Sequence, residues 1–271
     1  MEERSLRDLF HMVKRALPDQ QELVTVTADM EVRQALERMS KANINQVPVI
    51  ASNVTLGVFS YRSLAKGIIN LPKKQPFQLS LPVELFIEDL AYAGLSDEIA
   101  KLVDEFDTRD AVLVGSENQL LGILTTIDAL RYFYSVASPY VLLREIELSI
   151  RELIRVSISN EELSFCIDRC LKKHYEKRQQ SLPTSLEEMT FNDYVMLLRF
   201  DGNWQFFKDA WGGTSITVAA KLESLPNLRN DVFHFKRDLT IEEYDILRDR
   251  RDWLLKRIRK ADADRKVGKN D

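Results

Sequence analysis

The sequence predicts an α+β N-terminal half, made of two β-α-β-β-α repeats, followed by an all-α helical bundle. Two segments of the first half contain the same order of short strands and amphipathic helices, which indicates an internal repeat. After Tyr134 the strand-like runs stop, and apolar residues recur at helical spacing. A chain of 271 residues also favours two domains, because single cores rarely grow beyond about 250 residues.

The overall composition narrows the class of protein. Apolar residues make up 45% and charged residues 30% of the chain, a balance typical of soluble globular proteins. The formal net charge of −4 gives no overall basic field, so nucleic-acid binding would need a local basic patch. No apolar run reaches the roughly 18 residues of a membrane helix. We therefore expect no membrane partner. Two cysteines are too few for a disulfide framework, which is typical of a reducing compartment, so we expect a cytoplasmic protein.

The two repeats occupy residues 24–68 and 84–133. The first contains a short β-rich piece, an amphipathic helix, the strand VPVI, a turn at Ser52-Asn53, the strand LGVFS and a second helix. The second has the same order of parts, with AVLVG and LGILT as its strands. Three prolines in the stretch LPKKQPFQLSLP between the repeats predict a linker. We expect residues 1–135 to form one module.

The second half, residues 136–262, is expected to be helical throughout. The run VLLREIELSIRELIRV has apolar positions at helical spacing, and NEELSFCIDRCLKKHYEKRQQ continues the pattern. The stretch SLPTS interrupts it, and Ser185 before two glutamates predicts a new helix start. Gly212-Gly213 separates one helix from the next. Residues 263–271 are small and charged, and we expect a disordered tail there.

The N-terminal repeat resembles a tandem of CBS domains, known as a Bateman module, over about residues 12–135. The resemblance rests on VPVI with LGVFS in the first copy and on AVLVG with LGILTTID in the second. It implies paired β-α-β-β-α units that sense adenine nucleotides, with AMP, ADP, ATP or S-adenosylmethionine as the regulatory ligand. CBS pairs also commonly dimerise, so the resemblance favours a homodimer.

The second copy carries residue types that suit a nucleotide. A hydroxyl at Thr125 and the N–H groups of a helix N-terminus favour a phosphate. Asp128 can accept hydrogen bonds from a ribose diol. Alternatively, Thr125 merely caps the helix, with Asp128 as its first-turn acid. The resemblance adds Arg109 as a basic phosphate contact, although an arginine beside Asp107 and Asp110 can also be simply solvated.

The first copy departs from this pattern. It keeps a hydroxyl at Ser60, but Ser63 stands where the acid should be. The neutral pair Asn45-Gln46 stands at the position that corresponds to Arg109. We therefore expect one competent site in each chain, built mainly by the second copy.

In the helical half, Arg229, Asn230 and His234 form the pattern Arg-Asn-x-x-x-His inside LPNLRNDVFHFKRDL. The spacing of arginine and histidine alone is unspecific, because two further pairs satisfy it, Arg4 with His11 and Arg169 with His174. The following asparagine, the apolar setting and the position before the last long helix resemble the HEPN superfamily. That superfamily includes many ribonucleases that need no metal or other cofactor.

The chemistry of RNA cleavage suits these residue types. Histidine can move a proton when the 2′-hydroxyl attacks the adjacent phosphate, and a guanidinium can hold the charge that develops there. On an ideal helix, positions five apart point about 140° away from each other. One chain therefore makes an awkward site from Arg229 and His234. We expect a homodimer, formed through both halves, that brings two such segments together.

These features predict a cytoplasmic homodimer in which an adenine nucleotide controls an HEPN-type endoribonuclease that leaves 2′,3′-cyclic phosphate ends. The resemblance suggests a toxin-like or defence role, and nothing indicates a DNA partner. The alternative is a non-catalytic nucleotide-sensing regulator whose helical half binds RNA or a protein. In that case Arg229 would pair with Asp231 or Asp238, while Asn230 and His234 would satisfy buried polar groups.

Two further sequence patterns each allow two interpretations. The basic run at the end of the chain can track a phosphate backbone or form a salt-bridged surface with its interleaved aspartates; it comprises Arg248, Arg250, Arg251, Lys256, Arg257, Arg259 and Lys260. Cys166, Cys170 and His174 recur at every fourth position, as ligands on one helix face would. No fourth ligand is suggested nearby, so we expect the cysteines to pack as small apolar groups and no metal site.

Overall fold

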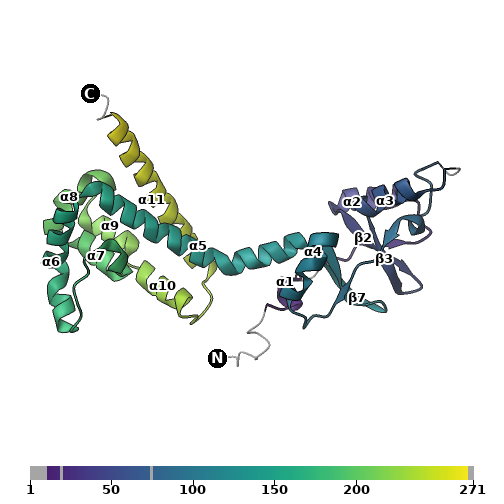
Figure 1. Ribbon diagram of the computed structural model, residues 1–271, viewed down its shortest axis with the longest axis horizontal. Coiled ribbons are helices and arrows are strands. Elements are labelled where there is room, and N and C mark those ends of the chain that lie inside the picture. Colours follow the sequence, from purple (N-terminus) through teal and green to yellow (C-terminus); the bar gives the residue numbers. More distant parts are fainter. Residues whose placement is uncertain (1–10, 19–20, 74–75, 268–271) are drawn as a thin grey trace. The chain divides into compact units, whose positions relative to one another are not determined.

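The structure, a computed structural model, describes residues 11–18, 21–73 and 76–267. The chain divides into two compact units between Tyr134 and Ser135, one residue before the boundary expected from the sequence. The first unit is mixed α/β and the second is predominantly helical, which confirms the predicted change of secondary structure between the two halves (Figure 1).

The first repeat forms a four-stranded sheet with strand order β1-β2-β3-β4. Strand β1 is parallel to β2, and the other neighbours are antiparallel. The elements follow the predicted order after the short helix α1 (Val13–Ala16): β1 (Val26–Thr27), α2 (Val32–Ala42), β2 (Gln46–Ala51), β3 (Val54–Ser60), α3 (Tyr61–Asn70), η2 (Val83–Phe86) and β4 (Ile87–Glu88).

The second repeat forms a three-stranded sheet with the same pairing, β5 parallel to β6 and β6 antiparallel to β7. Its elements are β5 (Tyr92–Ala93), η3 (Ile99–Leu102), α4 (Val103–Arg109), β6 (Ala111–Ser116), β7 (Gln119–Thr125) and the start of α5 (Thr126–Ser157). Strand β7 leads directly into α5 (Figure 1).

The hairpin of the first repeat turns where the sequence predicts. Ser52 and Asn53 both have positive φ, 51° and 64°. Two consecutive left-handed residues give the turn whose twist matches that of the flanking strands, and asparagine tolerates this conformation well. The turn at Ser52-Asn53 is therefore confirmed.

Apolar side chains hold the two sheets together. One face of the first sheet packs against α2, where Val47 and Phe59 share a buried cluster with Met39. Val58 faces the other way and shares a second cluster with Leu113 of the second repeat. Each fully buried side chain of this size contributes roughly 1.5–3 kcal/mol. The strands β2, β3, β6 and β7 are therefore the fixed frame of this unit.

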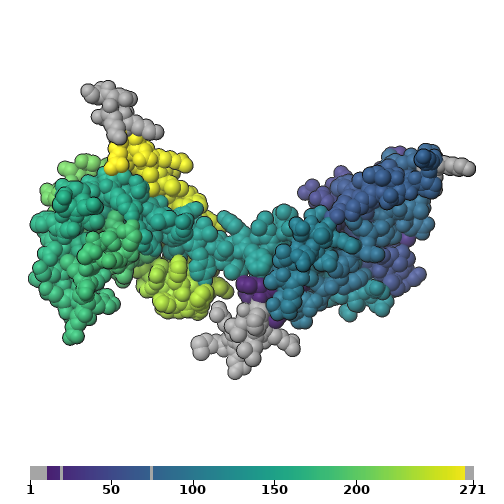
Figure 2. Space-filling view, viewed as in Figure 1, coloured from purple at the N-terminus to yellow at the C-terminus, as the bar shows by residue number. Residues whose placement is uncertain are grey.

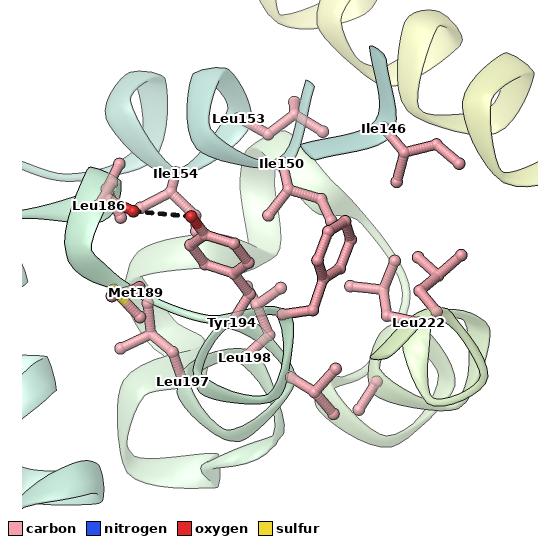
Figure 3. Close-up of a cluster of buried hydrophobic side chains, with 14 of the residues drawn as sticks. Ile146, Ile150, Leu153, Ile154, Leu186, Met189, Tyr194, Leu197, Leu198 and Leu222 are labelled. Atoms are coloured by element: carbon pink, nitrogen blue, oxygen red, sulfur yellow. Dashed lines mark hydrogen bonds between the residues drawn. The ribbon is translucent and has the colours of Figure 1, made fainter. Parts of the chain in front are cut away.

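The second unit is a set of helices around one apolar core. Beyond α5 it contains α6 (Asn160–Lys177), η4 (Leu186–Glu188), α7 (Phe191–Arg199), α8 (Asp201–Trp211), α9 (Ser215–Leu222), α10 (Leu225–Phe233) and α11 (Ile241–Val267). Figure 3 shows Ile150 and Ile154 of α5 next to Tyr194 of α7, and Ile146 of α5 on the side of Leu222 of α9. The Tyr194 hydroxyl donates to the carbonyl of Leu186 at 2.7 Å, which satisfies this buried polar group.

The sequence predicts two helix boundaries in this unit, a helix start at Ser185 and a break at Gly212-Gly213. After Ser185 the chain forms only the short 3-10 turn η4, and the next α-helix begins after Thr190, which caps it together with Asp193. Gly212 and Gly213 have φ of 63° and 79° and separate α8 from α9. The break at Gly212-Gly213 is therefore confirmed, whereas the helix start lies five residues later than predicted.

Helix α5 continues where the sequence indicated a change, although Pro139 lies inside it. Proline has no N–H, so it cannot bond to the carbonyl four residues earlier, that of Ser135. The hydroxyl of Tyr244 in α11 donates to this carbonyl at 3.1 Å. A donor from another helix thus replaces the missing bond, which explains why the proline does not end α5.

The expectation of a disordered tail over residues 263–271 is wrong for residues 263–267, because helix α11 runs to Val267. Residues 268–271 lie outside the described residues. Residues 261–267 contain neither glycine nor proline, and Arg265 donates to the carbonyl of Val156 at 3.3 Å. In the part of the chain that the structure describes, no helix is long and apolar enough to cross a membrane.

Several arginines of the basic run in α11 are used within the unit. Arg248 pairs with Asp245 at 3.3 Å, and Arg251 pairs with Asp252 at 2.9 Å. Arg250 donates to the carbonyl of Lys221 at 2.7 Å. These contacts favour the salt-bridged surface over a continuous track for a phosphate backbone.

A network of ion pairs fixes the turn between α10 and α11. Arg237 donates to both carboxylate oxygens of Glu243, each at 2.7 Å, and pairs with Asp231 at 2.9 Å. Hydrogen bonds from Arg237 and from the N–H of Thr240 lower the pKa of Glu243 from its usual 4.5 to about 2. We call Asp231, Arg237 and Glu243 the turn clamp.

The turn clamp predicts a pH-dependent contribution to stability. A carboxylate whose pKa is lower in the folded state stabilises the fold above its ordinary pKa, and that contribution is lost as the pH falls through the folded value. Wild type should therefore unfold at a higher temperature than Glu243→Gln above pH 4.5, and the difference should vanish toward pH 2. Thermal unfolding followed by circular dichroism across this range measures it. A difference that is the same at pH 2 and pH 6 would contradict the role of the charge.

Candidate functional site

Thr125 and Asp128 lie together where β7 ends and α5 begins. The Thr125 hydroxyl donates to Asp128 Oδ2 at 2.5 Å, and the N–H of Asp128 donates to Thr125 Oγ1 at 3.2 Å. The N–H of Thr125 also donates to Asp128 Oδ2, at 3.1 Å. The capping arrangement considered from the sequence is thus present in this structure.

Capping does not use the whole carboxylate of Asp128. Both bonds from Thr125 reach the same oxygen, Oδ2, whereas the ion-pair partner of Oδ1 among the described residues is Arg131 Nη1 at 4.0 Å. A carboxylate oxygen has two acceptor positions. The cap therefore leaves acceptor positions on Asp128 Oδ1 unused, in a side chain that is 14% exposed.

Arg109 lies at the end of α4, and its guanidinium donates to the carbonyl of Asp89. Its neighbour Asp110 pairs with Arg62 of the first repeat at 3.8 Å. The carbonyl of Asp110 accepts from the N–H of Thr126, the first residue of α5, at 3.0 Å. The backbone of Asp110, next to Arg109, therefore contacts the start of α5. The Arg109 side chain bonds to the carbonyl of Asp89 instead.

The first copy has the same capping arrangement, but a carboxylate closes it. Ser60 and Ser63 form a capping box at the start of α3, and both are almost fully buried. The Ser60 hydroxyl donates to Glu88 Oε1 at 2.7 Å, and Lys66 lies 3.7 Å from Glu88 Oε2. An anion supplied by the chain itself thus occupies the position where a phosphate would meet the hydroxyl.

The second copy has a neutral group at the corresponding strand edge. In the first copy Glu88 of β4 pairs with Val58 of β3. In the second copy the side-chain amide of Gln21 takes the place of such a strand: it accepts from the N–H of Ile123 at 3.0 Å and donates to the carbonyl of Ile123 at 3.1 Å. No carboxylate other than Asp128 bonds to Thr125 among the described residues.

Glu88 and Gln21 were not identified from the sequence. Glu88 lies 28 residues after Ser60, and Gln21 lies 102 residues before Ile123. Neither belongs to a recognisable motif, and their positions depend on which segment pairs with the edge of each sheet. The sequence indicated that the two copies differ only through Ser63 in place of an acid and through the neutral Asn45-Gln46 in place of Arg109.

The second candidate site lies at the end of α10. Arg229 is half-buried, its guanidinium lies 4.8 Å from the centre of the Phe233 ring, and its closest polar contact is Asn230 Oδ1 at 3.5 Å. His234 caps the C-terminus of α10 and is exposed. Within the described ranges its imidazole makes no hydrogen bond, ion pair or ring contact. The structure therefore leaves this ring accessible to a substrate.

The alternative pairing of Arg229 is not found. Asp231 belongs to the turn clamp and also lies 3.7 Å from Lys236. Asp238 contributes its carbonyl to Arg237 instead. Among the residues that the structure describes, Arg229 has no carboxylate partner. The exposed position of His234 also excludes the role of satisfying a buried polar group.

In the other two arginine and histidine pairs, the described side chains contact other residues. Arg169 lies over the rings of Phe165 and Phe200, and it donates to a carbonyl of α8. His174 contacts Arg178 instead, at 3.3 Å. His11 bonds to the hydroxyl of Tyr132 at 2.8 Å, while Arg4 lies outside the described residues.

The two cysteines of α6 behave as apolar groups. Burial raises the pKa of Cys166 to about 11 and that of Cys170 to about 12. Cys166 belongs to the buried core, and Cys170 packs against it. No group of three or more histidine, cysteine or acidic side chains is placed to hold a metal ion within the described ranges.

Two hollows on the surface lie away from both candidate sites. One lies along α2, beside Gln34 and Arg38. The other lies in the helical unit between Leu148 of α5 and Arg251 of α11. Neither includes a candidate residue.

Comparison with known proteins adds a family for the first repeat. The model of the CBS domain matches residues 6–70. No curated protein matches the chain. Among solved structures, a CBS domain-containing protein of unknown function from Bacillus anthracis str. Ames Ancestor is 21% identical and covers 47% of this chain and 96% of its own, with a TM-score of 0.40.

Two further solved structures have similar values. A CBS-domain containing protein from Agrobacterium tumefaciens is 20% identical and covers 46% of this chain and 95% of its own, with a TM-score of 0.40. CBSX2 in complex with AMP is 21% identical and covers 45% of this chain and 94% of its own, with a TM-score of 0.38. These values are too low to assign a function. The match of the family model, together with the β-α-β-β-α order, identifies the first repeat of this chain as a CBS domain.

Proposed function

We propose that the chain is a nucleotide-sensing regulatory protein whose ligand binds where β7 meets α5, in the second repeat. CBS domains as a class are nucleotide-sensing regulatory modules. The observation that supports this position most is the difference between the two copies. The Ser60 hydroxyl of the first copy donates to Glu88, a residue outside its cap, whereas the Thr125 hydroxyl of the second copy bonds within its own cap among the described residues.

The chemistry of an adenine nucleotide fits this junction. A phosphate oxygen accepts a hydrogen bond from the Thr125 hydroxyl once this hydroxyl turns away from Asp128 Oδ2, and the phosphate is favoured by the positive end of α5. The ribose diol donates to Asp128 Oδ1. All four proposed ligands, AMP, ADP, ATP and S-adenosylmethionine, carry this diol, so Asp128 serves each of them. Arg109 contributes as a phosphate contact once its guanidinium leaves the carbonyl of Asp89.

The variant Asp128→Asn tests the proposed ribose contact. Asparagine can still cap α5, because it also accepts from backbone N–H groups, but it loses the charge and one acceptor oxygen. We expect at least tenfold weaker binding of the nucleotide that wild type binds, with little change in melting temperature. Isothermal titration calorimetry with each of the four ligands measures the affinity and the number of ligands bound per chain.

The matched control is Ser63→Ala, which alters the corresponding cap in the first copy. This variant should bind nucleotide as wild type does, and wild type should bind one ligand per chain. Equal affinity of Asp128→Asn and wild type, or two ligands per wild-type chain, would remove the proposed assignment.

A second proposal concerns the helical unit: it cleaves RNA without a metal, in the manner of HEPN ribonucleases. The exposed imidazole of His234 supports it, together with the guanidinium of Arg229; within residues 11–18, 21–73 and 76–267 the imidazole has no hydrogen-bond partner and the guanidinium no carboxylate partner. The rival function is a regulator whose helical unit only binds RNA or a protein. In either case helix α5 links the two functions covalently, since it begins at Thr126 and reaches the core of the helical unit at Ile154.

The proposed reaction needs only groups on the chain and on the RNA. The 2′-oxygen forms a bond to phosphorus, and the bond from phosphorus to the 5′-oxygen breaks. The proton of the 2′-hydroxyl passes to a base, and a proton is supplied to the departing 5′-oxygen; His234 serves in these transfers. Arg229 holds the negative charge on the phosphate oxygens. The products are a 2′,3′-cyclic phosphate and a 5′-hydroxyl.

Cleavage in the presence of EDTA tests this second proposal. Wild type should cut unstructured RNA with excess EDTA, and His234→Ala should be slower by at least about 100-fold, the low end of general acid–base contributions. The matched control is His174→Ala, an exposed histidine with the same spacing to an arginine, which should cut as wild type does. Each protein is assayed with and without AMP, ADP and ATP, because a regulatory ligand must favour one state over another. No cleavage under any of these conditions favours the regulator that only binds.

A further inference from the structure

The turn that ends α10 contains a residue that the backbone does not favour. The N–H of Phe235 bonds to the carbonyl of Val232 at 3.2 Å, and the N–H of Lys236 bonds to the carbonyl of Asp231 at 2.9 Å. This pair of bonds is the Schellman motif, whose left-handed position is usually glycine. Here that position is Phe235, with φ of 52°.

Phenylalanine at this position costs stability relative to glycine. A side chain with a Cβ is strained at positive φ, and bulky residues adopt this conformation rarely. Burial of the ring could offset the strain, but 73% of Phe235 remains exposed. Neither backbone conformation nor packing therefore accounts for an aromatic ring at this position. A residue whose strained backbone conformation is not offset by burial of its side chain is a candidate for a functional role.

Phe235 belongs to an aromatic group beside the proposed RNA site. Tyr140 lies 5.4 Å from Phe233 and 6.4 Å from Phe235, measured between ring centres. The guanidinium of Arg229 lies over the other ring of the pair, Phe233, and His234 stands between the two phenylalanines in the chain. Figure 2 shows α10 and the residues after it, in yellow-green, at the surface of the second unit. We call Tyr140, Phe233 and Phe235 the aromatic patch.

The charges around the aromatic patch favour an anionic ligand. Asp231 is neutralised by the turn clamp, whereas Arg229 has no carboxylate partner among the described residues. Exposed rings next to a free cation are the combination that binds single-stranded nucleic acid, because bases stack on the rings and the cation meets the backbone. We propose that Phe235 stacks on an unpaired base of single-stranded RNA, next to the phosphate held by Arg229. This inference rests on RNA being the ligand of the helical unit.

The variant Phe235→Gly measures separately how Phe235 affects the stability of the fold and the affinity for RNA. Glycine relieves the strain at positive φ, so the melting temperature should stay the same or rise. Loss of the ring should weaken binding of a fluorescently labelled single-stranded RNA about tenfold, since base stacking on an aromatic ring is worth about 1–3 kcal/mol. Phe235→Trp should keep the affinity. The effect should be smaller for double-stranded RNA of the same length, whose bases are already stacked.

The matched control is Phe165→Ala, which removes an exposed ring of α6 that is 57% exposed. This variant should bind RNA as wild type does. Unchanged RNA affinity of Phe235→Gly would overturn the inference while leaving RNA as the ligand. Weaker self-association of Phe235→Gly in sedimentation, with unchanged RNA affinity, would make the aromatic patch an interface between copies instead. If wild type binds no RNA, the proposed RNA function itself fails.

Discussion

The turn clamp is the interaction on which the arrangement of the helical unit's candidate site depends. Arg237 holds Asp231 at the end of α10 and Glu243 at the start of α11, and so fixes the turn between the two helices. The same contacts neutralise the carboxylate closest in sequence to the site. As a consequence Arg229 has no acidic partner in the part of the chain that the structure describes, and His234 lies in an exposed turn. A positive charge that the protein has not already paired is the first requirement for binding a phosphate.

In the N-terminal unit, too, the position of a carboxylate distinguishes the proposed site from its counterpart in the other copy. Both repeats end a strand with a hydroxyl that caps the next helix. In the first repeat Glu88 bonds to that hydroxyl, and in the second the amide of Gln21 satisfies the strand edge without adding a charge. Two copies of one fold thereby differ in chemistry through a residue outside the repeated motif. Fold similarity alone would not distinguish the two junctions.

Much of the architecture could be predicted from the sequence, because it depends on local patterns. The order of strands and helices in both repeats, the turn at Ser52-Asn53 and the break at Gly212-Gly213 follow from periodicity and turn residues. The continuity of α5 through Pro139 could not, since it requires a hydroxyl from Tyr244. The partners of Asp231 and the roles of Glu88 and Gln21 also depend on contacts between distant segments. Local patterns do not specify such contacts.

We propose that a phosphodiester binds beside His234 because Asp231, the carboxylate nearest in sequence to Arg229, is already paired. Histidine-resolved NMR tests it directly, since the chain has only three histidines. A dinucleoside monophosphate with a 2′-deoxy group at the cleavage position, which cannot be cut, is titrated into the full-length protein. The account predicts that the ring signals of His234 shift in a saturable way, that Arg229→Ala abolishes this shift, and that the signals of His174 stay unchanged. Equal small shifts of His174 and His234, or no shift of either, would contradict it.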